Sequence, residues 1–189
     1  MDAHADGYAP TTMEDLRSAA PPPLRDDDHV RGEAGANLIV FYADFTCPRC
    51  ALAHERLTAA GAYVAFRHMA LKAKDARALP AACAAEAAAA QGCFWPFADA
   101  LYADQGRLED PHLWERARAL GLDVQRFDAD RKGPVAAARV QRDTRAALAA
   151  GATTTPMLYA GGIVLSGVPD RDYLTRLGYD DVVRIQKTS

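Results

Sequence analysis

The sequence predicts an α/β fold in which a β-α-β unit, a helical block and a β-β-α unit are arranged around a central mixed sheet. Three observations support this order. An apolar run over residues 38–43 leads into two cysteines and a helical pattern. Residues 62–71 read as a second strand, and two short β-type runs joined by a glycine pair occupy residues 157–166. Strands and helices in this succession are typical of α/β domains.

The first unit contains a strand near residues 37–42, a helix that starts at the two cysteines, and a strand within residues 62–71. The helix is expected to end at Gly61, because glycine readily adopts the backbone conformation that terminates helices. A single helix that joins two strands implies a right-handed βαβ unit with parallel strands.

A helical insertion is expected from about residue 75 to residue 150. Alanine dominates its first helix, and the aromatic residues of the second are expected to form the core of the insertion. Asp110 and Asp123 are expected to cap two of the later helices. The expected helices cover residues 79–91, 94–102, 110–121, 122–129 and 134–150.

The chain closes with a hairpin and a helix. Residues 157–160 and 163–166 are expected to pair across a Gly-Gly turn. Pro169 and Asp170 open the last helix, which is expected to run through Leu177. Residues 179–189 are expected to form a fraying helical tail.

The N-terminal part is expected to contribute little to the fold. Residues 1–25 combine Ala, Asp, Thr and three consecutive prolines, which predicts a flexible leader. Residues 26–189 make up the folded domain, and the charged segment 25–32 leads into its first core strand.

Composition and charge narrow the classes of function. The 189-residue chain has a formal charge of -3 with dispersed basic residues, so nothing favours nucleic-acid binding. No apolar run approaches the roughly 18 residues of a membrane-spanning helix, so no membrane insertion is expected. Residues 1–24 lack the continuous apolar segment of a secretory signal. This favours a cytoplasmic location, and the alternative is an extracytoplasmic location with an export signal outside this chain. The sequence does not indicate an oligomeric state.

Two cysteines, Cys83 and Cys93, lie within the helical insertion. On one continuous helix their separation would be about 15 Å. A disulfide needs Cα atoms within about 7 Å, so a bond between them would require the helix to break, for example at Gly92. We therefore expect two unpaired thiols.

The motif Cys47-Pro48-Arg49-Cys50 allows three interpretations. It is a redox dithiol, half of a zinc site with Asp44 or His54 nearby, or a chance pair within a helix. As a redox pair, Cys47 at the helix N-terminus is the exposed nucleophile and Cys50 the resolving thiol.

The two residues between the cysteines fit the redox interpretation. Pro48 suits the first position of a helix, where its missing N–H has no cost. Arg49 adds positive charge that lowers the pKa of Cys47, or it is a solvated side chain without effect.

These features together resemble the thioredoxin-fold disulfide oxidoreductases, and among them the DsbA-like proteins. The resemblance rests on Cys47-Pro48-Arg49-Cys50 after an apolar strand, on Thr155-Pro156 before the hairpin, and on the helical insertion. Asp28-His29-Val30-Arg31-Gly32 resembles a bacterial subgroup that also occurs appended to sodium/proton antiporters. The resemblance implies a thioredoxin fold and a cis Pro156. It also implies that the Thr155 backbone binds peptide.

One departure from the family concerns proton transfer. Family members usually carry a buried acid six positions before the first cysteine, where this sequence has Phe41. Asp44 or water would have to accept the proton of Cys50 instead. We expect His54 to face solvent and His68 to be structural.

The predicted function is thiol–disulfide exchange on protein or peptide substrates, with a redox-recycling partner and with no metal or other cofactor. One alternative is a non-catalytic or redox-sensing thioredoxin-fold module that binds or regulates another protein. A glutathione-conjugate isomerase or transferase is a third class, although such proteins usually lack the second cysteine. The sequence does not indicate the direction of exchange.

Overall fold

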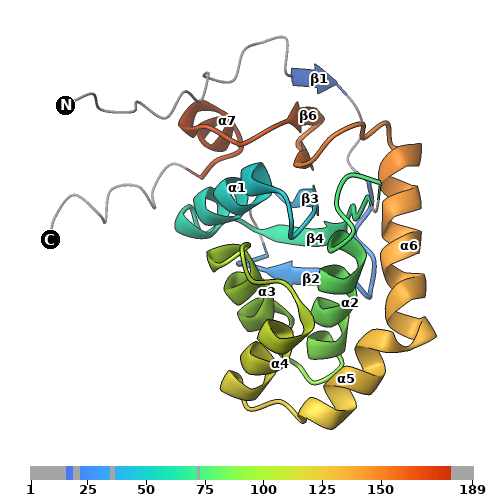
Figure 1. Ribbon diagram of the computed structural model, residues 1–189. Helices are drawn as coiled ribbons and strands as arrows, with labels where there is room; N and C mark the ends of the chain where they lie inside the picture. The colour runs from blue at the N-terminus through green and yellow to red at the C-terminus, as the bar shows by residue number, and fades with distance from the viewer. Residues whose placement is uncertain (1–15, 19–21, 35–36, 72, 180–189) are drawn as a thin grey trace, which may run out of the picture.

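The computed structural model describes residues 16–18, 22–34, 37–71 and 73–179. It contains one six-stranded sheet with the strand order β1-β6-β5-β3-β4-β2 (Figure 1). The strands are β1 (Leu16–Ser18), β2 (His29–Arg31), β3 (Ile39–Ala43), β4 (Val64–His68), β5 (Met157–Ala160) and β6 (Ile163–Ser166). The helices are α1 (Pro48–Ala59), α2 (Ala78–Ala89), α3 (Phe94–Ala103), α4 (Asp110–Ala119), α5 (Val124–Lys132), α6 (Pro134–Ala149) and α7 (Arg171–Arg176).

The sheet is mixed, as the sequence predicts. Strand β3 runs parallel to β4 and antiparallel to β5, so the β3-α1-β4 unit has the expected parallel strands. All residues of β3 and β4 are buried, which explains why β3 is apolar throughout and why β4 begins with Val64, Ala65 and Phe66. Ala43 lies opposite His68, so the ends of both strands meet at the edge where α1 begins.

The two faces of the sheet carry different cores. Phe41 and its same-face neighbours in β3 pack in the larger core, which also includes buried residues of α1, α7 and the helical insertion. Tyr42 points to the opposite face and packs in a smaller core with Ala147 of α6 (Figure 1). The sheet is therefore a layer between helices on both sides.

Helix α2 is the centre of the helical insertion. Eight of its twelve residues are buried, and seven of these are alanines. Short side chains allow close approach, and α2 makes contacts with α3, α4, α5 and α6. Asp123 caps α5 as predicted, through a hydrogen bond from the Arg126 N–H. The predicted cap of α4 was one residue too late: Glu109 is the N-cap residue and Asp110 is the first helical residue.

Two short strands lie in segments where the sequence predicts none. Strand β1 falls within the expected leader and pairs with β6, and β2 falls within the charged segment and pairs with β4. Three residues are too few for an alternating pattern, and the pairing partners lie far away in the sequence. The remaining expected leader, residues 1–15 and 19–21, and residues 180–189 of the expected tail lie outside the described residues.

A helix that crosses a lipid bilayer must be both long and apolar. Within the described ranges, no helix combines the length and the apolar character needed to cross a membrane.

Candidate functional site

The Cys47–Cys50 pair lies at the start of α1, shortly after the end of β3. Cys47 is the N-cap residue of α1, and Pro48 occupies the first turn of the helix. The backbone N–H groups of Cys50 and Ala51 donate to the Cys47 carbonyl at 3.0 and 3.2 Å. Cys47 is partly exposed, whereas Cys50 is fully buried against the core. One thiol is therefore accessible to a reactant and the other is shielded.

The surroundings of Cys47 stabilise its thiolate. A hydrogen bond with the Cys50 thiol is the largest influence, and it lowers the pKa of Cys47 to about 6 against the opposing effect of burial. Hydrogen bonds from the Thr155 side chain and from backbone groups of Cys50 and Arg49 act in the same direction. Arg49 thus contributes to this pKa through its backbone.

The surroundings of Cys50 have the opposite effect. Burial raises the pKa of Cys50 well above its ordinary value, and the hydrogen bond and charge of Cys47 raise it further. At neutral pH the pair consequently holds one thiolate and one thiol. This asymmetry is what a nucleophile and a resolving thiol require.

The loop that contains Thr155 and Pro156 lies directly beside the thiolate. The Thr155–Pro156 peptide bond is cis. In its thiol form, the Sγ atom of Cys47 donates to the Thr155 carbonyl oxygen at 3.5 Å. On the other side of the loop, the Pro156 carbonyl accepts from the Gly167 N–H at 3.0 Å. Cys47 and Thr155, which are 108 positions apart in the sequence, therefore lie next to each other.

Asp44 is buried next to the dithiol. Its Oδ1 atom accepts from the backbone N–H and the hydroxyl of Thr46, each at 2.8 Å. Burial raises the pKa of Asp44 despite these two hydrogen bonds. A backbone hydrogen bond connects Asp44 with the sulfur of Cys50. The backbone of Asp44 therefore contacts the shielded thiol, while its carboxyl group is held by Thr46.

Phe41 has no carboxyl group and therefore cannot accept a proton at this site. Its side chain is fully buried and packs edge-to-face on Phe66, with 5.8 Å between the ring centroids. The acidic residue nearest the dithiol in the sequence is Asp44, whose backbone hydrogen-bonds with the sulfur of Cys50.

The prediction that His54 faces solvent was wrong. His54 is 8% exposed, and its Nε2 atom lies 2.7 Å from Oδ1 of Asp99. Burial lowers the pKa of His54, although the Asp99 carboxylate opposes this. The i, i+4 spacing from Cys50 places His54 on the inner face of α1, where α3 supplies its partner.

Two further residues near the dithiol were missed by the sequence analysis. The Tyr102 hydroxyl is buried without a hydrogen-bond partner, and its ring lies 4.7 Å from that of His54. The Gln105 side chain donates to the carbonyl oxygens of Phe45 and Cys47 at 2.7 and 3.0 Å. Tyr102 belongs to the aromatic cluster expected as core, whereas no pattern in the sequence distinguishes Gln105.

An open groove lies between α1 and α3, beside the dithiol. It has a volume of about 680 Å³. Its lining includes Leu52 and His54 of α1 and Asp99 and Tyr102 of α3, and the His54–Asp99 pair connects the two helices.

The other two interpretations of the motif receive less support from the geometry. Among the described residues, the cysteines do not belong to a group of three His, Cys, Asp or Glu side chains with converging ligand atoms. His54, the nearest candidate ligand in the sequence, is paired with Asp99. Cys83 and Cys93 are free thiols, the first buried on α2 and the second partly exposed before α3.

Comparison with known proteins identifies the family. The family model of the DSBA-like thioredoxin domain matches residues 61–177, more than half of the chain. The chain belongs to the DSBA-like thioredoxin domain family. The matched region of this family includes Pro156 and begins after the two cysteines of the motif. The reactivity of the dithiol therefore has to be argued from its own geometry.

Solved structures of DsbA proteins share the fold. A thioredoxin-like oxidoreductase from Silicibacter pomeroyi DSS-3 superimposes with a TM-score of 0.73 over 87% of this chain and 95% of its own, at 22% identity. The oxidoreductase DsbA from Xylella fastidiosa has a TM-score of 0.64 and 23% identity, with coverage of 96% and 100%. At such identities the likeness concerns the fold.

Curated relatives of this DSBA-like chain have higher identity but are much longer. The Na(+)/H(+) antiporter NhaA of Herminiimonas arsenicoxydans is 39% identical over 85% of this chain and 27% of its own length. The Na(+)/H(+) antiporter NhaA 3 of Salinispora tropica is 40% identical over 72% and 22%, respectively. The chain thus spans about a quarter of the length of the curated relatives it matches.

Proposed function

We propose that the protein is a thiol–disulfide oxidoreductase whose redox pair is Cys47 and Cys50. The observation that carries this proposal is the asymmetry of the pair: a partly exposed thiolate with a pKa of about 6 beside a fully buried thiol whose pKa is raised. The DsbA-like fold supports the same class of activity.

The proposed reaction begins when the Cys47 thiolate attacks one sulfur of a substrate disulfide. A bond forms between Cys47 and that sulfur, and the other substrate sulfur leaves as a thiolate that takes up a proton from water. Cys50 then loses its proton and attacks the Cys47 sulfur. This releases the second substrate thiolate, so that the substrate is reduced and the protein carries a Cys47–Cys50 disulfide. The reverse sequence oxidises a substrate dithiol.

We assign proton transfer at Cys50 to Asp44. The carboxyl group is buried three residues before Cys47, and burial raises its pKa above that of an ordinary aspartate, which makes it a better proton acceptor. No carboxyl group is present at position 41, where the family usually has one, so Asp44 replaces it from the end of the same strand.

Thr155 and Pro156 are proposed to position the substrate. The Thr155 carbonyl contacts the Cys47 sulfur, so a peptide that approaches Cys47 must also pass this loop. The partners would be proteins or peptides with thiols or disulfides and a second redox protein that resets the pair. The redox step described takes place between the two cysteines and the substrate sulfurs, and it requires no metal or other cofactor.

A turnover assay tests the proposal. We expect the protein to accelerate the reduction of insulin by dithiothreitol and the Cys47→Ser variant to lose this effect. Cys93→Ser is a matched control, because Cys93 is also partly exposed but lies before α3, away from the pair. Equal rates for the wild-type protein and Cys47→Ser would refute the enzymatic function.

The reduction potential of the pair gives the direction of exchange. A value near about -120 mV would indicate an oxidase, and a value near about -270 mV a reductase. It can be measured by equilibration with glutathione buffers followed by separation of the two redox forms.

A regulatory module is the second candidate function. The antiporter names of the curated relatives and the absence of an acid at position 41 favour it. In this case the Cys47–Cys50 couple would switch between two states without turnover. The insulin assay separates the two functions, since a switch would show a defined potential but no acceleration.

A further inference from the structure

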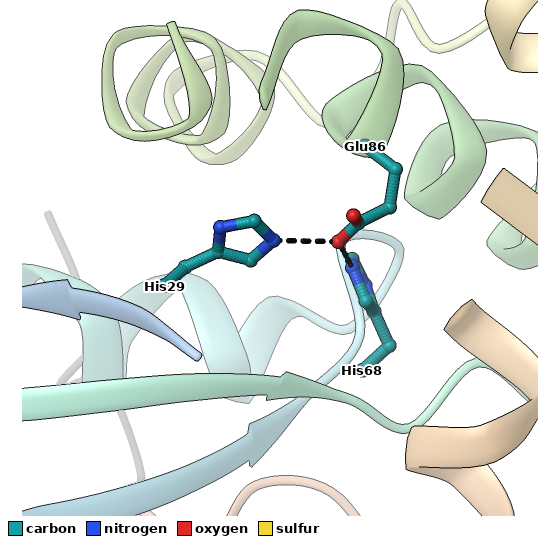
Figure 2. Close-up of side chains that lie close together, drawn as sticks. All are labelled: His29, His68 and Glu86. Atoms are coloured by element: carbon teal, nitrogen blue, oxygen red, sulfur yellow. Dashed lines mark hydrogen bonds and ion pairs between the residues drawn. The ribbon is translucent and has the colours of Figure 1, made fainter. Parts of the chain in front are cut away.

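Three side chains from distant parts of the chain come together between the sheet and helix α2. His29 comes from β2, His68 from the end of β4 and Glu86 from α2 (Figure 2). The Nε2 atoms of both histidines lie 2.7 Å from the same oxygen, Oε1 of Glu86. The three potential ligand atoms all lie within 4.8 Å of one another. We call these residues the His-Glu-His cluster.

Packing holds the rings of the cluster in place. The side chain of His68 is 1% exposed, that of Glu86 11% and that of His29 14%. The His29 ring stacks on Phe94 with 3.6 Å between centroids. Phe66 contacts the His68 ring edge-on at 5.2 Å. Such fixed side chains are preorganised, and binding a ligand would cost little conformational entropy.

Glu86 supplies a buried negative charge. The Nε2 atoms of His29 and His68 both contact its carboxylate. Among the described residues, the hydrogen bonds to Glu86 come from these two imidazoles and both go to Oε1. The second carboxylate oxygen is therefore available to a ligand.

The three side chains have the ligand types and the spacing of a metal-binding site. We propose that His29, His68 and Glu86 bind a divalent transition-metal cation, with Zn²⁺ as the best match. Two imidazole nitrogens and one carboxylate are ligands that zinc accepts, with water in the fourth position. The two imidazoles would each place their proton on Nδ1, so that both Nε2 lone pairs face the metal.

The geometry requires only a small adjustment. With metal–ligand distances of about 2.0–2.1 Å, tetrahedral coordination separates neighbouring ligand atoms by about 3.3 Å. The present Nε2–Oε1 separations are 2.7 Å, so these atoms have to move apart by a fraction of an ångström, and all three ligand atoms lie within 4.8 Å of one another. Packing fixes the two imidazole rings, so a shift of the Glu86 carboxylate makes most of this adjustment.

The cluster is partly accessible to solvent. The side chains of His29 and Glu86 are 14% and 11% exposed, whereas that of His68 is 1% exposed. Glu86 also lines an open groove of about 490 Å³ between α2, α5 and the start of α6.

The proposed site is separate from the dithiol. Among the described residues, the group of converging ligand atoms contains His29, His68 and Glu86 and neither Cys47 nor Cys50. The ring of Phe45, from the turn before Cys47, lies 6.0 Å from the ring of His68. A metal ion at the cluster would connect β2, β4 and α2. It would therefore stabilise the fold, whether or not the protein exchanges disulfides.

The test uses the full chain with the Cys47–Cys50 disulfide formed, because the reduced thiolates would compete for zinc. We expect isothermal titration with ZnCl₂ to show one equivalent bound and the melting temperature to rise with zinc. His29→Gln and Glu86→Gln should each weaken binding at least ten-fold. Glu86→Gln keeps a side chain of the same shape, and far-UV circular dichroism verifies that each variant is folded.

Two control variants make the result specific. His112→Gln removes a partly exposed histidine on α4, and Cys83→Ala removes the buried thiol three residues before Glu86. Both should bind zinc like the wild-type protein. With Co²⁺ as a spectroscopic probe, we expect weak visible bands and no sulfur-to-metal charge transfer. Failure of the oxidised protein to bind zinc, unchanged affinity in His29→Gln and Glu86→Gln, or a thiolate band would each overturn the proposal.

Discussion

Cys47 shows how local contacts change the chemistry of a single residue. Its pKa of about 6 results first from the Cys50 thiol and then from Thr155 and backbone donors. We expect the thiolate absorbance near 240 nm of the reduced protein to titrate with a midpoint near pH 6 and the signal to be absent in Cys47→Ser. Cys50→Ala should shift the midpoint upward, because it removes the largest stabilising contact. A midpoint near 9 in the wild-type protein would contradict this assignment.

The same pKa has a consequence for stability. The pKa of Cys47 is lower in the folded protein, about 6, than its ordinary value of 9.0. The contribution of Cys47 to the stability of the reduced form is therefore complete above about pH 9 and is lost as the pH falls through 6. The oxidised form has no thiol at this position. Urea unfolding of both forms at pH 5 and pH 8 should show the reduced form gaining stability relative to the oxidised form at the higher pH.

Asp44 is the second residue with a testable role. If it accepts the Cys50 proton, Asp44→Asn should slow the resolving step by about 10²-fold and leave the attack by Cys47 unchanged. Rapid mixing of the reduced protein with a chromogenic disulfide would then reveal accumulation of the mixed disulfide. Asp75→Asn is the control, because Asp75 interacts electrostatically with Asp44 but pairs with Arg77 near the surface. Identical resolving rates in Asp44→Asn and the wild-type protein would exclude the role.

The sequence identified the site residues that follow local rules. A cysteine at a helix N-terminus with proline after it is a local pattern, so the positions of Cys47 and Cys50 could be predicted. The burial of His54 could not, because its partner Asp99 lies 45 residues away. The His-Glu-His cluster was missed for the same reason, although His68 was expected to be structural. Its members are brought together only when β2 pairs with β4 and α2 packs behind them.

At the scale of elements, one buried ion pair fixes the segment before β2 to the sheet. Arg67 of β4 donates to both carboxylate oxygens of Asp28, at 2.8 and 2.6 Å, and both side chains are fully buried. It also donates to the Pro23 carbonyl at 2.6 Å. The charged segment that appeared to be only an approach to the first strand is therefore anchored to the core through Asp28.

Removal of one partner should be costly. Arg67→Met leaves the Asp28 carboxylate buried without its counter-ion, and we expect a loss of about 3–5 kcal/mol in the free energy of unfolding. The double variant Asp28→Asn/Arg67→Met should recover much of this loss. Arg142→Met is the control, because Arg142 is 46% exposed and pairs with Asp27 at the surface, where about 1 kcal/mol or less is expected. Urea titration measures all three, and similar losses for Arg67→Met and Arg142→Met would contradict the interpretation.

Elements with local signals were predicted well, and elements defined by pairing were not. The hairpin strands β5 and β6 have the predicted bounds, since alternating residues around a Gly-Gly turn encode them locally. The short strands β1 and β2 exist because β6 and β4 offer backbone partners at the two edges of the sheet. Their own residues carry no such signal.

At the scale of the whole molecule, the four cysteines divide into two classes. Cys47 and Cys50 form the proposed redox pair, whereas burial and the Glu86 carboxylate raise the pKa of Cys83 to about 11. The oxidised protein should therefore contain two free thiols under denaturing conditions and the reduced protein four. In the native oxidised protein, only Cys93 should react rapidly with Ellman's reagent. A count of zero thiols in the denatured oxidised protein would show that Cys83 and Cys93 are also bonded.

The close packing of the alanines in α2 limits which amino-acid substitutions this helix can tolerate. Ala81, Ala84, Ala85 and Ala88 have at most 1% exposure, and the helices around them approach across single methyl groups. An added methylene has no space there, so substitutions by larger side chains should cost about 1–3 kcal/mol each through overpacking. Variation is easier at exposed positions of the outer helices, such as Val135 at 81% exposure. Over evolutionary time, α2 should therefore retain small residues while the helices around it diverge in sequence.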